Sequence, residues 1–106
     1  MYFLCFMADP ISVAAKIMGN RVRAQRQKLG VSQETLADLA GLHWTFVGQV
    51  ERGMRNVSLH NIIKLAGGLA IDPAELVRGL TTGQTPEPQS RTKAADAIRE
   101  ARGLAS

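Results

Sequence analysis

The sequence predicts an all-α fold, with a compact five-helix domain over residues 19–80. Apolar residues recur at three- and four-residue spacing in several short segments, and no segment alternates apolar and polar residues as a strand would. Serine, aspartate and glycine stand between these segments, where helices begin and end. The rest of the chain divides into an N-terminal extension (1–18, an arm or an extra helix), a linker (81–90) and a C-terminal tail or helix (91–106).

The first eight residues, MYFLCFMA, are apolar but too short to cross a membrane, and no basic leader marks them as a signal peptide. Three interpretations stay open for these residues: an arm, a strand that pairs with another strand, or a translation-start artefact. The last is possible because Met7 and Met18 could also be start residues. Asp9-Pro10 predicts a helix start. We expect this helix to run to Leu29, with a possible break near Gly19-Asn20. Its expected core contacts are Ile17, Val22 and Leu29.

The central stretch, Gln33 to Arg52, predicts two short helices joined by a tight turn. Ser32 can cap the first helix, and Gly41 ends it because glycine adopts the left-handed conformation without steric cost. Small and apolar residues follow the spacing of a helix-turn-helix at Ala37, Gly41, Val47 and Val50. A plain helical hairpin is the alternative on spacing alone. Other apolar positions of the pair are Leu36, Leu39, Ala40 and Phe46.

Two further helices complete the predicted domain. Ser58 can cap the fourth, in which Gly67-Gly68 is interpreted as a slack point. Asp72-Pro73 opens a short fifth helix that buries Leu76 and one of Val77 or Leu80. The apolar positions of the fourth helix are Leu59, Ile62, Leu65, Ala66 and Leu69.

The C-terminal region is polar and rich in helix formers. The linker TTGQTPEPQS precedes RTKAADAIREARGLAS, for which Ser90 is a possible cap. Only Ile98 and Leu104 are sizeable apolar residues in that segment. It is therefore expected either as a frayed tail helix or as a helix that docks on a partner subunit.

Composition narrows the classes of function. Thirteen basic against nine acidic residues give a net charge of +4 and a pI of about 9.8, which favours a polyanionic partner. The single cysteine, Cys5, excludes an internal disulfide and fits a reducing, cytoplasmic interior. One cysteine and two histidines are too few for a metal cluster, so we expect no metal or cofactor. No carboxylate pair, nucleophile–base set or phosphate-cradling glycine loop suggests an enzyme.

The blocks RVRAQRQKLGVSQETLADLAGL, FVGQVERG, RNVSL and LAIDPAEL, in register from residue 21 to residue 76, resemble the Cro/phage-repressor-type helix-turn-helix family of xenobiotic-response-element regulators. Within that family, HWTFVGQVERGMRNVSLHNIIKLA is similar to the small controller proteins of restriction–modification systems. The resemblance implies a lambda-repressor-like fold. It also implies a homodimeric transcriptional regulator, a repressor or autoregulator, that binds double-stranded DNA sequence-specifically.

Family members place the second helix of the pair, here about residues 43–52, in the major groove of a pseudo-palindromic operator. Gln49 can then bind adenine through its amide, and Thr45 can offer a hydroxyl or contact a thymine methyl. Trp44 either lies against thymine methyls and sugars or folds back over the domain. The base-reading positions implied by the resemblance are Trp44, Thr45 and Gln49. The implied DNA-backbone contacts are Gln33, His43, Arg52, Arg55 and Asn56.

The resemblance also implies structural roles. Arg26 and Glu51 correspond to a partly buried salt bridge between the first and third helices. The fifth helix, through Leu76, Val77 and Leu80, is the expected dimer interface, with the N-terminal arm and the C-terminal helix as other candidates. An antitoxin that wraps a toxin with its tail and also binds DNA is the alternative function. No membrane partner is expected, and no small-molecule effector, because the chain has no separate ligand domain.

Overall fold

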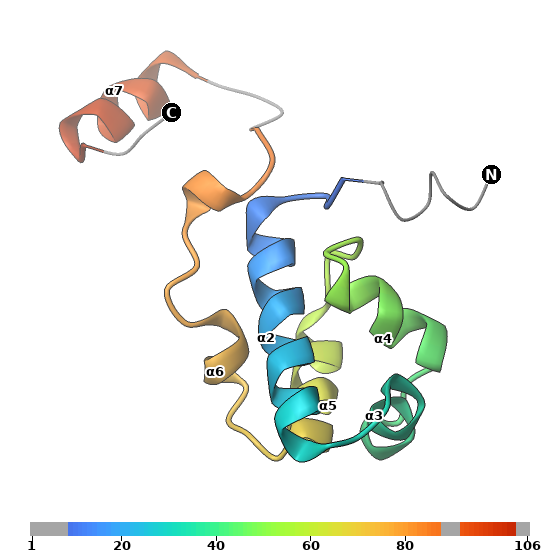
Figure 1. Cartoon of the computed structure of the whole chain (residues 1–106). Helices are drawn as coiled ribbons and strands as arrows, with labels where there is room; N and C mark the ends of the chain where they lie inside the picture. Colours follow the sequence, from blue (N-terminus) through green and yellow to red (C-terminus); the bar gives the residue numbers. More distant parts are fainter. Residues whose placement is uncertain (1–8, 88–91, 104–106) are drawn as a thin grey trace.

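The computed structural model describes residues 9–87 and 92–103. Over these ranges it contains six α-helices, one 3-10 turn and no strand, which confirms the predicted all-α fold (Figure 1). None of the helices in the described part of the chain is long and apolar enough to cross a membrane. The helices are α2 (Val13–Leu29), α3 (Gln33–Ala40), α4 (Trp44–Glu51), α5 (Leu59–Leu69), α6 (Ala74–Val77) and α7 (Lys93–Ala101), with η1 (Thr82–Gln84) between α6 and α7.

The first described helix, α2, begins later than the sequence predicted. Its cap is Ser12, whose Oγ accepts a hydrogen bond from the Ala15 backbone N–H at 3.0 Å, so the expected start at Asp9-Pro10 is wrong. The reason is that the Ile11 N–H donates to the Gly53 carbonyl at 2.9 Å, which holds the entering chain against the loop after α4. The helix then continues unbroken through Gly19-Asn20, and the domain boundary expected after residue 18 falls inside it.

Local capping signals were predicted correctly elsewhere. Ser32 and Ser58 cap α3 and α5 by accepting backbone hydrogen bonds at 3.0 and 3.3 Å. Gly41 ends α3 with φ of +71°. The end of α5 is different, because Ala70 takes the left-handed conformation there, with φ of +58°. An alanine in this conformation is strained, whereas a glycine would not be.

The core lies where α2, α3, α4 and α5 meet, and α6 closes one side of it. The predicted core contact Leu29 is instead exposed, and so are two of the regularly spaced apolar residues, Leu39 and Leu59. Leu29 is the last residue of α2 and Leu59 the first of α5, so both lie beyond the end of the core, while Leu39 is turned away from it. The buried core residues are Met18, Val22, Leu36, Ala37, Val47, Val50, Leu65, Ala66, Leu69 and Leu76.

Two glycines mark close helix crossings that the sequence did not reveal. A Cβ placed on Gly19 would lie 2.2 Å from the Val50 carbonyl oxygen, so α2 and α4 touch backbone to backbone. A Cβ on Gly68 would lie 3.1 Å from the Ala40 backbone nitrogen. The interpretation of Gly67-Gly68 as a slack point is therefore wrong for Gly68, which permits the close approach of α5 to α3. Gly67 has nothing within 4 Å of such a Cβ.

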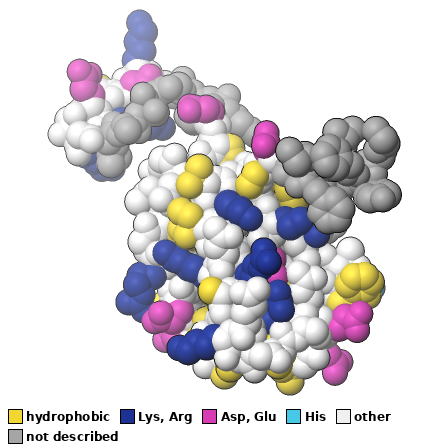
Figure 2. All heavy atoms as spheres, viewed as in Figure 1, with side chains coloured by type: hydrophobic (Ala, Val, Ile, Leu, Met, Phe, Trp, Pro, Cys, Tyr) yellow, Lys and Arg dark blue, Asp and Glu magenta, His cyan; other side chains and the backbone are white. Residues whose placement is uncertain are grey.

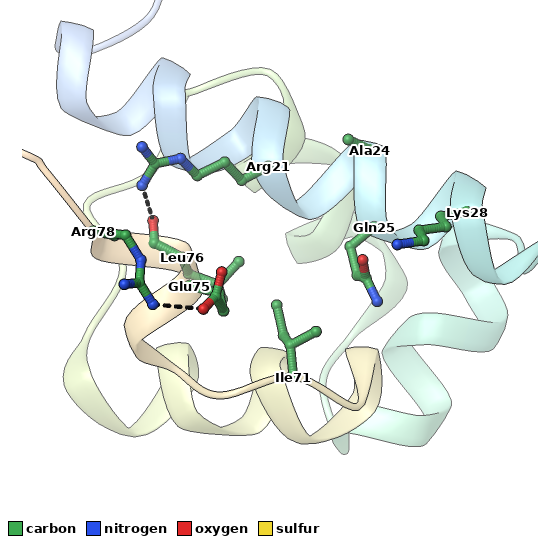
Figure 3. A pocket seen from close by; sticks show the side chains of 8 residues that line it. All are labelled: Arg21, Ala24, Gln25, Lys28, Ile71, Glu75, Leu76 and Arg78. Carbon is green, nitrogen blue, oxygen red and sulfur yellow. Dashed lines mark hydrogen bonds and ion pairs between the residues drawn. The ribbon is translucent and has the colours of Figure 1, made fainter.

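Side chains of α2 bind the carboxyl ends of two later helices. Arg21 Nη1 donates to the Leu76 carbonyl at 3.2 Å (Figure 3). Gln25 Nε2 donates to the Leu69 carbonyl at 3.2 Å. These bonds satisfy carbonyl oxygens that a helix end leaves without an intrahelical partner. The Arg21 bond holds α6, only four residues long, on the side of α2, and the Gln25 bond holds the end of α5 there.

The C-terminal helix α7 stands apart from the other helices in Figure 1. Thr92 caps it, with Oγ1 accepting from the Ala95 N–H at 3.0 Å. None of its residues is buried, and Ile98 is 49% exposed. The expected cap Ser90, the apolar Leu104, the N-terminal run of residues 1–8 and Cys5 all lie outside the described residues.

Candidate nucleic-acid interface

Helix α4 has one buried and one free side. Val47 and Val50 are buried against the core. With 3.6 residues per turn, the other side carries the positions that the resemblance assigned to base reading. Trp44 is 53% exposed, Thr45 is exposed and Gln49 is half-buried. The structure therefore brings the three candidate base-reading residues together on one open helix face.

The amino end of α4 is capped by a histidine. His43 Nδ1 accepts a hydrogen bond from the Thr45 backbone N–H at 3.2 Å, so the ring occupies the capping position in this structure. The Trp44 ring stacks beside it, with centroids 6.1 Å apart and planes inclined by 22°. Trp44 also lines a shallow hollow next to α3 together with Glu34 and Asp38. The tryptophan thus rests partly on the protein while half of its surface stays exposed.

A buried carboxylate ties α4 to the two preceding helices. Glu51 is 4% exposed, and Arg26 donates to both of its oxygens, at 2.6 Å from Nε and 3.0 Å from Nη2. Arg26 Nη1 also donates to the Val31 carbonyl at 2.9 Å. The salt bridge implied by the resemblance is thus present in the structure. The hydrogen bond to Glu51 raises the pKa of Arg26, and the negative charge of Glu51 adds to this rise, whereas partial burial of the guanidinium opposes it.

Gln33 belongs to the same network. Its Nε2 donates to Glu51 Oε1 at 3.0 Å, so one of its two amide hydrogens is already bound. Its side-chain oxygen, Oε1, lies 3.4 Å from the position of a Cβ on Gly48, which is an ordinary van der Waals distance, and Gly48 is buried. Gln33 therefore packs against Gly48 at the contact between α3 and α4. Glu51 is the common acceptor that joins α2, α3 and α4, and it fixes the direction in which the free face of α4 points.

The loop after α4 folds back onto the same helix. Gly53 turns the chain with φ of +77°, and the Met54 N–H donates to the Gln49 carbonyl at 2.9 Å. This places the Arg55 guanidinium 5.0 Å from the centre of the Phe46 ring, with Nη1 3.3 Å from Gln49 Oε1. Sequence reasoning missed this contact, and the only signal for it was Gly53, the glycine of the ERG block. Arg52, Arg55 and Asn56 are all exposed at this end of α4.

The expected dimer surface needs one correction. Leu76 is fully buried in the core, so it cannot contact a second subunit in the folded protein. Val77 is 40% exposed, and Leu80 is half-buried. Both line an apolar groove of about 350 Å³, whose walls also include Ile11, Met18, Ile62 and Pro86.

Positive charge is spread over more than one surface. In the view of Figure 2, Lys and Arg side chains are distributed across the side of the molecule where α2 lies. A second hollow, of about 420 Å³ between α2 and α6, is lined by Arg21, Lys28 and Arg78, and Arg78 is paired with Glu75 (Figure 3). The described residues contain no cluster of three or more histidine, cysteine or acidic side chains that could hold a metal.

Several known proteins are similar to this chain in sequence. Residues 22–76 match the helix-turn-helix family. Control protein C.BamHI of Bacillus amyloliquefaciens is 43% identical over 68 residues, which cover 63% of this chain and 84% of that protein. Control protein C.SmaI of Serratia marcescens is 42% identical over 66 residues, which cover 62% of this chain and 73% of that protein.

Two solved structures extend the likeness to three dimensions. The restriction–modification controller protein C.AhdI of Aeromonas hydrophila superposes with a TM-score of 0.57 and 56% identity, covering 58% of this chain and 94% of that one. The c2 repressor of Salmonella phage P22, solved with a synthetic operator, superposes with a TM-score of 0.56 and 31% identity, covering 60% of this chain and 97% of that one. The chain described here therefore belongs to the helix-turn-helix family of sequence-specific DNA-binding transcriptional regulators.

Proposed function

We propose that the protein binds a pseudo-palindromic operator as a homodimer, with α4 of each copy in the major groove. The observation that carries this proposal is the open face of α4, which presents Trp44, Thr45 and Gln49 on a helix whose direction is fixed by the buried Glu51. The major groove is wide enough to admit such a helix. Relatives that are named control proteins and repressors support a cytoplasmic role in repressing transcription or regulating the protein's own gene.

The polar groups of α4 suit base recognition. Gln49 carries an amide that can donate and accept, and Thr45 carries a hydroxyl and a methyl group. Either group can contact a base edge in the major groove, and the Trp44 ring can lie against a thymine methyl or a sugar. These three side chains would supply sequence preference, because base contacts carry specificity whereas phosphate contacts set position.

Backbone contacts would come from the ends of α3 and α4. Gln33 keeps one free amide hydrogen at the amino end of α3, where backbone N–H groups favour an anion. His43 lies at the amino end of α4, and its Nδ1 is used in capping, so a phosphate contact would fall to the rest of its ring. Arg52, Arg55 and Asn56 follow at the other end of the helix.

The decisive test is selection of bound duplexes from a random library at 50 and 200 mM salt. A regulator with about 6–10 phosphate contacts should lose roughly 10³–10⁵ in affinity between these salt concentrations. It should nevertheless select a symmetric sequence at both. Gln49→Ala and Thr45→Ala should each remove the preference at their own position. Gln27→Ala, which truncates an exposed glutamine of α2, is the matched control and should leave the selected sequence intact. Strong binding without any consensus would contradict the proposal.

The proposed dimer forms through the surface around Val77 and Leu80, with the adjoining groove as part of the contact. Two-fold symmetry is expected because two recognition helices must meet half-sites about one helical turn, ~34 Å, apart. Sedimentation equilibrium tests this surface. Val77→Asp should convert the dimer to monomers, whereas Ile98→Asp, on the exposed face of α7, should leave it intact. The reverse result would assign dimerisation to α7.

A further inference from the structure

Gln49 does not stand free on the recognition face. Its amide oxygen accepts a hydrogen bond from Arg55 Nη1 at 3.3 Å. A guanidinium has five donors and no acceptor, so this contact is possible only with the amide oxygen turned toward Arg55. The NH₂ group of Gln49 then points the other way. The orientation of this amide, which is ordinarily ambiguous, is thus set by the chemistry of its neighbour.

Arg55 is itself held in place by contacts with α4. Its guanidinium lies over the Phe46 ring at 5.0 Å, within the range of a cation–π contact. The chain leading to it is tied back by the Met54 N–H, which donates to the Gln49 carbonyl at 2.9 Å. Gly53 begins this turn and packs tightly, since a Cβ there would lie 2.9 Å from Lys16 Cα. Phe46 and the turn together keep the guanidinium beside Gln49.

This contact changes what Gln49 can read. A glutamine that binds adenine in a two-pronged manner accepts from N6–H with its oxygen and donates to N7 with its nitrogen. Here Arg55 already occupies one of the two lone pairs of that oxygen, whereas neither hydrogen of the NH₂ group has a partner among the described residues, so the side chain offers mainly donors. Donors match the acceptors of guanine, O6 and N7, or the O4 of thymine.

We propose that Arg55 is a positioning residue that sets the base preference of Gln49, so that the base it faces in the operator is guanine or thymine and not adenine. This inference rests on the proposed function, because it requires α4 to enter the major groove. It assigns Arg55 a role in specificity, where the sequence suggested a contact with the DNA backbone.

The test is the same selection from random duplexes, performed with the full chain and three variants. Gln49→Ala identifies the position that Gln49 reads, since the preference is lost there. Wild type should select guanine or thymine at that position. Arg55→Met keeps the aliphatic stem and removes the donor, so it should shift that position toward adenine by about tenfold while the other positions keep their preferences. Arg23→Met is the matched control, because it makes the same change at an exposed arginine of α2 that has no hydrogen bond to Gln49 among the described contacts. It should leave the preference unchanged.

Other outcomes separate the possible failures. If Arg55→Met weakens binding to all sequences, reduces the salt slope by about one and leaves the Gln49 position unchanged, Arg55 is a phosphate contact and the inference is wrong. Selection of adenine at that position by wild type would also overturn it, as would an unchanged consensus in Gln49→Ala. In each of these cases a wild-type consensus still supports the proposed function. Absence of any wild-type consensus would overturn the function and the inference together.

Discussion

Replacing Gly19 by alanine is expected to force α2 and α4 apart. The new Cβ would lie 2.2 Å from the Val50 carbonyl oxygen and 2.9 Å from that of Glu51. Both neighbours are backbone atoms, so no change of rotamer relieves the overlap. Ordinary carbon–oxygen contacts are about 3.3 Å or longer, and the two helices must therefore separate by roughly 1 Å.

The expected cost follows from two opposing terms. Overpacking of a close-packed core costs about 1–3 kcal/mol, and this case belongs at the upper end because two rigid helices must move. Alanine is better than glycine within a helix by roughly 1 kcal/mol. The net effect is a loss of about 2 kcal/mol in the free energy of unfolding. The movement also displaces Glu51 from Arg26, which adds to the loss.

Urea unfolding followed by far-ultraviolet circular dichroism measures this loss. For a small domain the dependence of the unfolding free energy on urea is about 1 kcal/mol per molar, so the midpoint should fall by about 2 M. Gly67→Ala is the matched control, since it makes the same change within α5 where nothing lies within 4 Å. It should raise stability by up to about 1 kcal/mol. A midpoint for Gly19→Ala at or above that of wild type would refute the reasoning.

Two further changes test other features of the fold. Ala70→Gly should raise the free energy of unfolding by about 1 kcal/mol, because it removes the strain of a left-handed alanine at the end of α5. A thermal melt that shows no increase in Tm would contradict this strain. Glu51→Gln should lower the free energy of unfolding by about 3 kcal/mol, because Arg26 would keep its charge in a largely buried site without a carboxylate partner. In urea unfolding, the double change Arg26→Met with Glu51→Leu should recover part of that loss, and a double variant less stable than Glu51→Gln would argue against an uncompensated charge as the cause.

The sequence by itself determined the class of the protein and most of its helices. Serine caps at Ser32 and Ser58 and the left-handed turn at Gly41 are local features, because each depends on residues within one helical turn. The spacing of apolar residues located the helix-turn-helix for the same reason. The resemblance also implied the Arg26–Glu51 pair, which the structure contains.

Only the tertiary structure decided which residues of distant segments meet. Gly19 looked like a possible helix break until α4 was seen to cross it, and the complete burial of Leu76 in the core is what removes it from the expected dimer interface. The partners of Gln33 and Gln49 likewise depend on how α4 and its following loop pack. Helix propensity and periodicity describe a segment alone, whereas these contacts depend on the distance and angle at which separate helices cross. That geometry is set by the packing of the whole core.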